Sequence, residues 1–395
     1  MLSTRTFLVP PVLITGSGSS DIVGQEIAKL GLKKGLLVTD GVLCRTEMLE
    51  RIKNKLQENK IEFAIYDSID SEPTVDFVAN GLEVYRKEAC RFVIAVGGGS
   101  AIDTAKAICA MATNEGSIAD YKGLNRLPNR SAPLIAVPTT AGTGSEVTVF
   151  TIITDTKTDV KMLIGSPYLM PRVAIVDPLL TVSCPRELTA AVGIDALTHA
   201  IEAYVSLKAQ PMSDLFALSA IEFISGNLRQ AWANGNNIEA REKTMMGALQ
   251  AGIAFSNSSV ALVHGMSRPI GAYFHVAHGV SNAALLGPVT EFSLLGNPER
   301  YADIALAMGE NVEGLTAMEA AMVAAEAIND LVSDVQIPLL SELGVDENKL
   351  EKLAPKMAEA AIASGSPGNN PRQATKAEII ELYKIVYKKC RLPEA

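Results

Sequence analysis

The sequence predicts two domains, an α/β first half built on a mostly parallel sheet and an all-helical second half. Its 395 residues are too many for one domain of roughly 150 residues. Up to about residue 180, short apolar runs alternate with amphipathic segments, which is the pattern of β-α units. After Pro185 strand-like runs nearly vanish, and Ala, Leu, Met and Glu dominate. Since Ser183 or Pro185 can open the first helix, we place the domains at 1–184 and 185–395.

Four core strands are predicted in the first half, each ending in a loop of polar or glycine residues. They lie at 36–40, 63–66, 92–96 and 134–137, with helices near 21–32, 46–59, 74–89 and 101–112. Two further runs, 149–154 and 160–164, flank the turn 155–159 and predict a hairpin. Ligands of open α/β sheets bind at the carboxyl ends of strands, so the loops after Val38, Val96 and Val137 are candidate binding sites.

The second half shows helical periodicity separated by turn clusters. Helices are predicted at 186–206, 212–231, 238–267, 298–308, 315–332, 347–362 and 375–389. Residues 244–267 carry no charged side chain and are long enough to cross a bilayer. Their polar residues would need partners in lipid, so we expect a helix buried inside a globular domain.

Composition excludes several classes of protein. With 48% hydrophobic and 20% charged residues, the chain is neither disordered, collagen-like nor a coiled coil. A formal charge of −9 argues against nucleic acid as a partner. The five cysteines form no C-x-x-C pair, which argues against a disulfide framework or a thiolate zinc site. The N-terminus has no apolar core of signal-peptide length, so we expect a cytoplasmic protein that has no membrane partner.

Two glycine-containing loops predict a phosphate-binding site. Residues 97–106, GGGSAIDTAK, follow a strand and open a helix, where free amide groups and the helix dipole favour an anion such as pyrophosphate. The alternative for this loop is a tight βα turn. Residues 138–146, PTTAGTGSE, follow another strand and offer four hydroxyl groups. Asp40 ends the strand 36–40, where a carboxylate would accept hydrogen bonds from a ribose and favour NAD over NADP, unless it only forms a turn.

The four histidines, His199, His264, His275 and His278, all lie in the helical half. Asp195 and His199 are four residues apart, so they share one face of a helix, as ligands of helix-borne metal sites do. Three imidazoles and one carboxylate suit Fe, Zn, Mn or Ni. The alternative is a set of unrelated core or capping histidines.

Five motifs in order make the chain resemble the iron-containing, or group III, alcohol dehydrogenase family. They are GGGSAIDTAK at 97–106, PTTAGTGSEVT at 138–148, GIDALTHAIE at 193–202, VH at 263–264 followed by FHVAHG at 274–279, and NPRQAT at 370–375. The resemblance implies a Rossmann-like, dinucleotide-binding α/β domain, an all-α metal-binding domain and a homodimer or larger homo-oligomer. It also implies a metal, iron by family, that acts as a Lewis acid on a small alcohol or aldehyde while hydride passes to or from NAD.

The resemblance also assigns roles to individual residues. The metal ligands would be Asp195, His199, His264 and His278. The residues around NAD would be Asp40, Gly97, Gly98, Gly99, Ser100, Asp103, Thr139, Thr140, Thr143, Ser145, Thr148, Lys161 and Leu180. Phe150 and Phe255 would narrow the substrate channel and favour short chains, although Phe150 can equally be hairpin core.

The chain departs from the family at Arg268, where members commonly carry another histidine. Arg268 follows His264 by one helical turn, so it would face the substrate and favour a carboxylate or sulfonate tail. The alternative is that it faces solvent or an acidic neighbour. His275 remains as a candidate proton relay or contact to the nicotinamide ribose, with structural packing as its alternative.

Two other functions stay open. One is a glycerol-dehydrogenase-like polyol dehydrogenase, or a dehydroquinate-synthase-like lyase, of the same superfamily, although the set of Asp195 and three histidines favours the alcohol dehydrogenase. The other is a non-catalytic protein that binds metal or nucleotide. Following NADH absorbance with short alcohols after metal loading distinguishes a dehydrogenase from a protein that only binds metal or nucleotide.

Overall fold

The computed structural model describes residues 4–158 and 160–388 and divides into two compact units. The N-terminal unit is Leu8–Ser183, and the helical unit begins at Cys184 and includes residues 4–7. Residues 4–7 belong there because Arg5 donates a hydrogen bond to the Ala209 carbonyl (2.5 Å) and Phe7 stacks on Phe216. Asp159, in the predicted hairpin turn, and Cys390 lie outside the described residues.

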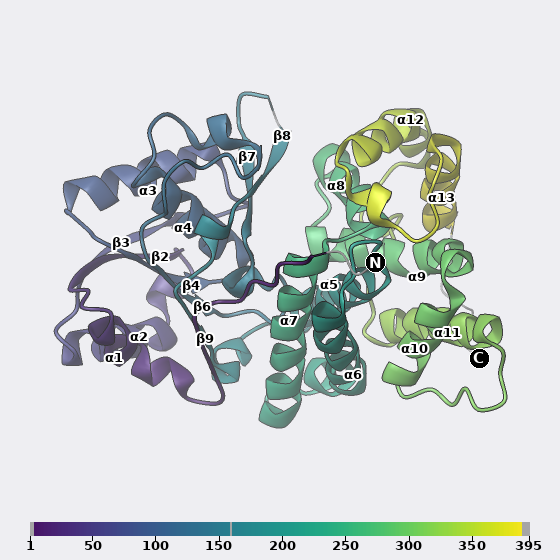
Figure 1. The fold of residues 1–395 in the computed structure, drawn as a ribbon, viewed down its shortest axis with the longest axis horizontal. Helices are drawn as coiled ribbons and strands as arrows, with labels where there is room; N and C mark the ends of the chain where they lie inside the picture. The colour runs from purple at the N-terminus through teal and green to yellow at the C-terminus, as the bar shows by residue number, and fades with distance from the viewer. Residues whose placement is uncertain (1–3, 159, 389–395) are drawn as a thin grey trace. The chain divides into compact units, whose positions relative to one another are not determined.

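A parallel six-stranded sheet forms the centre of the N-terminal unit, in the order β1-β9-β6-β4-β2-β3 (Figure 1). The strands are β1 (Val12–Thr15), β2 (Lys34–Asp40), β3 (Glu62–Ile69), β4 (Val93–Gly97), β6 (Leu134–Pro138) and β9 (Val173–Val176). The helices are α1 (Val23–Lys29), α2 (Glu47–Glu58), α3 (Val75–Lys87) and α4 (Gly99–Met111). The predicted α/β fold is confirmed; β1 and β9 were not predicted.

Side chains alternate between two hydrophobic clusters, one on each face of this sheet. Leu36 and Val38 pack in a cluster with residues of α3 and α4, whereas Leu37 between them packs with residues of α1 and α2. Because helices cover both faces, the strands read as continuous apolar runs.

The strand order changes direction between β2 and β4, which makes their carboxyl ends a topological switch point. These strands are neighbours, but the chain leaves β2 for β3 on one side and β4 for β6 on the other. Helices that follow two such strands cover opposite faces of the sheet, which opens a crevice where ligands bind. Asp40 ends β2 and Gly97 ends β4, so two predicted binding positions lie at this point.

A smaller sheet of β5 (Gly123–Leu124), β8 (Val160–Gly165) and β7 (Phe150–Asp155) completes the N-terminal unit. β7 and β8 pair antiparallel, which confirms the predicted hairpin.

Short 3-10 helices occur in both units. They lie at Ser19–Ile22, Leu43–Arg45, Ile118–Tyr121, Ser145–Val147, Pro167–Leu169, Pro178–Thr181, Leu294–Gly296 and Ser366–Asn369.

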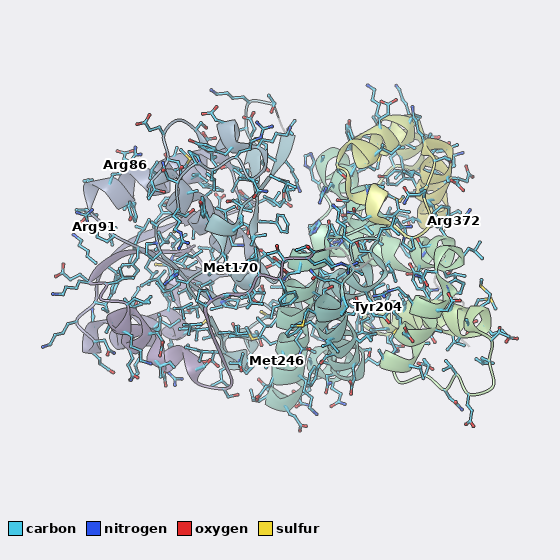
Figure 2. The ribbon with its side chains drawn as sticks, in the orientation of Figure 1. Arg86, Arg91, Met170, Tyr204, Met246 and Arg372 are labelled. Carbon is cyan, nitrogen blue, oxygen red and sulfur yellow. The ribbon has the colours of Figure 1, made fainter. Side chains whose placement is uncertain are left out.

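The helical unit confirms the predicted all-α second half. Its helices are α5 (Arg186–Val205), α6 (Pro211–Ala233), α7 (Ile238–Ser258), α8 (Leu262–Phe274), α9 (His278–Ser293), α10 (Pro298–Ala307), α11 (Ala317–Asp334), α12 (Glu347–Ala363) and α13 (Lys376–Lys388). The central helix α5 packs against α6, α7 and α9. At its end, the Tyr204 hydroxyl, labelled in Figure 2, donates to Asp303 (2.5 Å), and Arg300 lies over the Tyr204 ring.

The prediction of one helix over 238–267 is wrong. The chain breaks at Ser259, whose φ is +68°, and α7 and α8 differ in direction by 102°. Asn369 holds the break by donating to Ser259 Oγ (3.1 Å) and to the Val260 carbonyl (2.9 Å). The tertiary contact from residue 369 therefore ends a helix that the local pattern continues.

Of the helices in the described ranges, none alone is long and apolar enough to cross a membrane. α7 and α8 satisfy the criteria of length and composition only as a bent pair. α9 was missed because glycines and Pro288 interrupt its periodicity.

Candidate functional site

In the N-terminal unit, α4 begins at the end of β4 as the predicted anion site requires. Gly98 is its N-cap, and no side chain caps the helix. The first-turn N–H groups of α4, which include that of Ser100, therefore have no side-chain acceptor, and the helix dipole adds a favourable field for an anion.

The second loop packs directly on the first. A Cβ added to Gly99 would lie 2.7 Å from Cγ2 of Thr143, and one added to Gly98 would lie 3.5 Å from Oγ1 of Thr140. The Thr139 amide donates to the Gly97 carbonyl (3.1 Å). Glycine is thus required at 99 because the loops approach too closely for a larger residue. The structure brings these predicted cofactor residues together.

Asp103, predicted beside NAD, instead bonds inside the protein with both carboxylate oxygens. It accepts from Ser145 Oγ (2.8 Å) through one oxygen and from the Ile152 amide (2.8 Å) through the other. It is buried, and burial raises its pKa. Asp103 and Ser145 therefore join α4 to the second loop.

Lys106 is a buried residue to which the sequence analysis gave no role. Its ammonium donates to the carbonyl and hydroxyl of Thr148 (2.9 and 2.7 Å) and to the Phe150 carbonyl (2.7 Å). Burial lowers the pKa of Lys106 to about 8. Burial raises the pKa of the neighbouring Glu146 to about 7, although the charge of Lys106 opposes that shift. The sequence did hold a signal of this burial. Lys106 follows Asp103 by three residues, in a helix whose sequence has no periodic polar face.

The remaining predicted cofactor residues have different surroundings. Asp40 accepts from the Val42 and Leu43 amides through Oδ1 (2.9 and 2.8 Å), which is the predicted turn; in the described ranges its Oδ2 accepts no hydrogen bond. Lys161 pairs with Glu72 (2.5 Å). Leu180 lies in the hydrophobic cluster on the α1 and α2 face.

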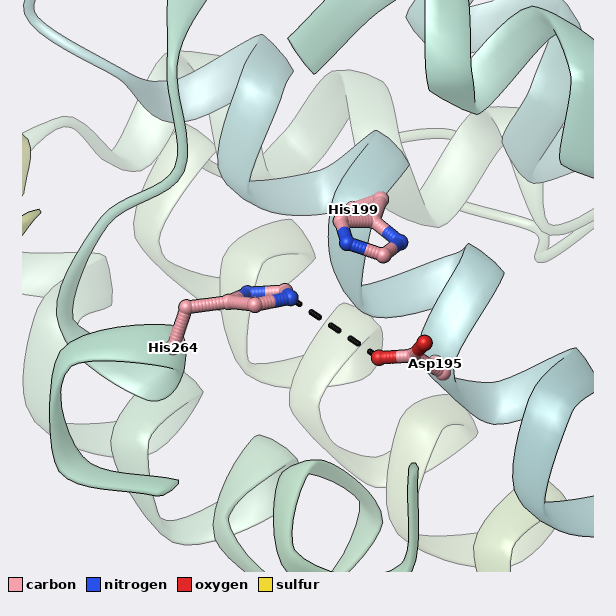
Figure 3. Close-up of side chains that lie close together, drawn as sticks. All are labelled: Asp195, His199 and His264. Carbon is pink, nitrogen blue, oxygen red and sulfur yellow. Dashed lines mark ion pairs between the residues drawn. The ribbon is translucent and has the colours of Figure 1, made fainter. Parts of the chain in front are cut away.

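In the helical unit, three helices bring the four predicted metal ligands together. α5 carries Asp195 and His199, α8 carries His264, and α9 begins at His278. Ligand atoms of Asp195, His199 and His264 lie within 4.8 Å of one another (Figure 3). Asp195 Oδ1 is 3.7 Å from His264 Nε2 and 3.9 Å from His278 Nε2. Two donors about 2.1 Å from one ion can be at most about 4.2 Å apart, so these pairs fit a shared ion.

The chemistry of this cluster also fits a divalent metal. Burial, reinforced by the neighbouring His264, lowers the pKa of His199 well below its usual value, so the imidazole is neutral and can ligate. Its Nδ1 is buried and has no hydrogen-bond partner in the described structure. Phe255 stacks on the His199 ring at a centroid distance of 4.2 Å and fixes its plane.

Two buried residues that the sequence analysis missed contact these ligands. Glu202, on α5, places Oε2 2.6 Å from His264 Nδ1, and its Oε1 accepts from the Val263 amide (2.6 Å). Asn282, on α9, donates through Nδ2 to Asp195 Oδ1 (2.6 Å). Their spacing was the available signal, since Glu202 follows His199 by three residues and Asn282 follows His278 by four.

Arg268 and His275 differ in burial. α8 continues through Pro269, so Arg268 lies one turn after His264. Burial lowers the pKa of the Arg268 guanidinium, opposed by the charge of Glu202, and Arg268 makes no hydrogen bond or ion pair with any described residue. His275 is exposed, has a φ of +57° and ends α8 by donating its amide to the Gly271 carbonyl.

Comparison with known proteins gives concordant matches over nearly the whole chain. The family described as iron-containing alcohol dehydrogenase matches residues 10–178, and the C-terminal part of the Fe-containing alcohol dehydrogenase family matches residues 189–387. A 1,3-propanediol dehydrogenase of Citrobacter freundii is 44% identical over 96% of this chain and 98% of its own length.

Two solved structures are similar in fold and sequence. A 1,3-propanediol oxidoreductase has a TM-score of 0.95 and 43% identity, covering 97% of this chain and 100% of its own. The sulfoacetaldehyde reductase of Bifidobacterium kashiwanohense, solved with NAD+, has a TM-score of 0.89 and 29% identity. The match covers 98% of this chain and 100% of the reductase chain.

Proposed function

The chain belongs to the iron-containing alcohol dehydrogenase family, and from this we propose that it is an NAD-dependent, divalent-metal-dependent oxidoreductase. Its reaction would interconvert a short primary alcohol and its aldehyde. The observation that carries the proposal is the convergence of one carboxylate and three imidazoles from α5, α8 and α9.

Asp195, His199, His264 and His278 would hold the metal, which we assign as iron from the family, although the donor set also accepts zinc, manganese or nickel. When bound, a divalent metal supplies Lewis acidity to the alcohol or aldehyde oxygen, and NAD supplies the hydride acceptor. The protein contributes a buried carboxylate and a neutral, oriented His199 ring, so little reorganisation is needed.

NAD would bind at the carboxyl ends of β2, β4 and β6. The uncapped start of α4 and the loop 138–148 would receive the pyrophosphate, and Oδ2 of Asp40 would accept from the ribose. The NAD+ in the sulfoacetaldehyde reductase structure supports this choice. Lys161 would exchange its pairing with Glu72 for a contact to the cofactor, and Leu180 would contact it at the edge of the cluster.

The remaining predicted substrate residues are Phe255, His275 and Phe150. Phe255 would limit substrate size beside His199, on which it stacks. The role proposed for Phe150, which lies on β7, comes from the family resemblance alone. His275 would contact the nicotinamide ribose or relay a proton to solvent, for which its exposure is suitable.

The direct test is to strip the protein with a chelator, reload it with Fe²⁺, Zn²⁺, Mn²⁺ or Ni²⁺, and follow NADH absorbance with short alcohols. We expect turnover only after loading, and its loss in Asp195→Ala. Glu187→Gln, an exposed change on the same helix, serves as the control. Tight NAD binding without turnover on any metal would instead favour a non-catalytic binding protein.

We further propose that the preferred substrate carries a carboxylate or sulfonate tail, which Arg268 binds. The half-buried guanidinium of Arg268 makes no hydrogen bond or ion pair within the described residues, so an anionic ligand would give it a partner. Arg268 lies one turn from His264, within reach of a short substrate whose oxygen is at the metal centre.

This substrate preference is tested by comparing kcat/KM for a neutral alcohol, such as 1,3-propanediol, with that for a carboxylated or sulfonated alcohol. Since a hydrogen bond to a charged group contributes about 1.5–3 kcal/mol, Arg268→Ala should lose about 10- to 100-fold on the anionic substrate alone. Arg229→Ala, an exposed arginine of α6, is the matched control. Equal losses on both substrates would remove the proposed role of Arg268.

By resemblance to the family, we also propose a cytoplasmic homo-oligomer, a dimer or larger. Light scattering after size-exclusion chromatography would measure its mass, and cell fractionation would locate it. A monomer at micromolar concentration would contradict the first part.

A further inference from the structure

We propose that Glu202 and Asn282 are positioning residues that set the metal ligands in ligating geometry before the ion arrives. This inference rests on the proposed metal-dependent function. Glu202 acts through His264, and Asn282 acts through Asp195. Both side chains are buried, and they come from helices that already carry ligands.

Glu202 selects the tautomer of His264. Its Oε2 lies 2.6 Å from His264 Nδ1, a contact in which we propose that the carboxylate oxygen accepts and Nδ1 carries the hydrogen. The lone pair is then on Nε2, the atom that faces Asp195 Oδ1 at 3.7 Å. A carboxylate behind a ligating histidine fixes its ring orientation and raises its basicity.

The second oxygen of Glu202 fixes the helix that carries His264. Oε1 accepts from the Val263 amide in the first turn of α8, which no N-cap side chain supports. A carboxylate at this end also interacts favourably with the helix dipole. One buried side chain therefore sets both the start of α8 and the rotation of the His264 ring.

Asn282 gives independent support for the same arrangement. Its Nδ2 lies 2.6 Å from Asp195 Oδ1, 3.1 Å from His264 Nε2 and 3.2 Å from His278 Nε2. An amide nitrogen only donates, and its two hydrogens can serve Asp195 Oδ1 and one histidine nitrogen at a time. In the metal-free protein, Asn282 would hold the unprotonated ligands facing a common point, which reduces the reorganisation that metal binding requires.

The first experiment uses the wild-type metal-free protein. With only four histidines in the chain, ¹⁵N NMR of the imidazoles can assign each tautomer. We expect His264 in the Nδ1–H form, identified by the loss of its signals in His264→Gln. An Nε2–H form of His264 would overturn the role of Glu202 without reference to any variant's stability.

The second experiment measures Co²⁺ affinity by chelator competition and by the visible absorption of the bound ion. Glu202→Gln removes the carboxylate, and Asn282→Leu replaces the amide by a group of similar shape. Loss of residues that orient metal ligands typically costs about 10- to 100-fold in metal affinity, so we expect this rise in Kd and a changed Co²⁺ spectrum. Glu222→Gln and Asn227→Leu, both on α6, are the matched controls.

The outcomes separate this inference from the function on which it rests. If wild type binds Co²⁺ and both variants keep its Kd and spectrum, the positioning role is wrong while the metal centre stands. If wild type binds no Co²⁺, both are wrong. The thermal unfolding of each metal-free variant is measured alongside. If Glu202→Gln does not fold, Glu202→Asp replaces it, because this change keeps the carboxylate but shortens its reach. The same loss of Co²⁺ affinity is expected.

Discussion

Three ionisable side chains are buried together in the N-terminal unit, Asp103 and Lys106 on α4 and Glu146 in the loop 138–148. Lys106 bonds to Thr148 and Phe150, and Asp103 bonds to Ser145, so both hold this loop against α4. Removing one member of such a group leaves a buried charge without compensation. We therefore propose that these residues set the shape of the proposed cofactor site.

Glu146 gives a prediction about pH and stability. Burial raises its pKa from 4.5 to about 7, so between these values the folded protein holds a proton that the unfolded chain has released. Stability should consequently fall as pH rises through this window, by up to about 1.4 kcal/mol per pH unit. Denaturant titrations from pH 5 to 8 should show a smaller fall in Glu146→Gln than in wild type, and an unchanged one in Glu62→Gln, an exposed control. Parallel curves for wild type and Glu146→Gln would contradict the buried titration.

At the scale of elements, close approaches of backbone position the functional loops. Gly99 lets the start of α4 meet Thr143, and Gly279 lets α9 meet the Ala191 carbonyl of α5, where a Cβ would lie 2.6 Å away. The second approach sets the distance between His278 and Asp195, which belong to those two helices. The absence of a side chain at Gly279 therefore helps to fix the positions of the proposed metal ligands His278 and Asp195.

Gly99→Ala should weaken NAD binding because the new Cβ would lie 2.7 Å from Thr143 Cγ2. We expect about a tenfold rise in the Kd for NAD, measured by calorimetry or NADH fluorescence, and partial recovery in the double variant with Thr143→Ser, which removes that methyl group. Gly226→Ala, where an added Cβ meets nothing within 4 Å, should leave the Kd unchanged. A normal Kd in Gly99→Ala would show that the two loops can separate without cost.

At the scale of the whole molecule, the proposed metal and cofactor sites belong to different compact units. Since an ion that binds only the folded state adds stability by mass action, metal removal should act on the helical unit. At 100 times Kd the added stability is about 2.7 kcal/mol.

Hydrogen exchange measured with and without a chelator should locate this effect. We expect chelation to speed exchange in the segments around Asp195, His264 and Asn282, with little change in the sheet of the N-terminal unit. Uniform loss of protection across both units, or loss confined to Leu8–Ser183, would place the metal elsewhere.

Local patterns in the sequence are enough to predict the α/β and all-helical halves and the set of four candidate ligands. Hydrophobic periodicity and the spacing of residues along one helix are local properties, so they can be read without a structure. The pairing of Asp195 with His199 follows directly from helical geometry.

Tertiary packing sets the break at Ser259, the inward bonds of Asp103 and the contacts of Glu202 with His264 and of Asn282 with Asp195. These hydrogen bonds join residues from 42 to 110 positions apart in the chain. Hydrogen bonds between elements carry no periodic signal, because their partners are chosen by packing and by the need to satisfy buried polar groups. The sequence identifies the candidate metal ligands, and these tertiary hydrogen bonds orient them.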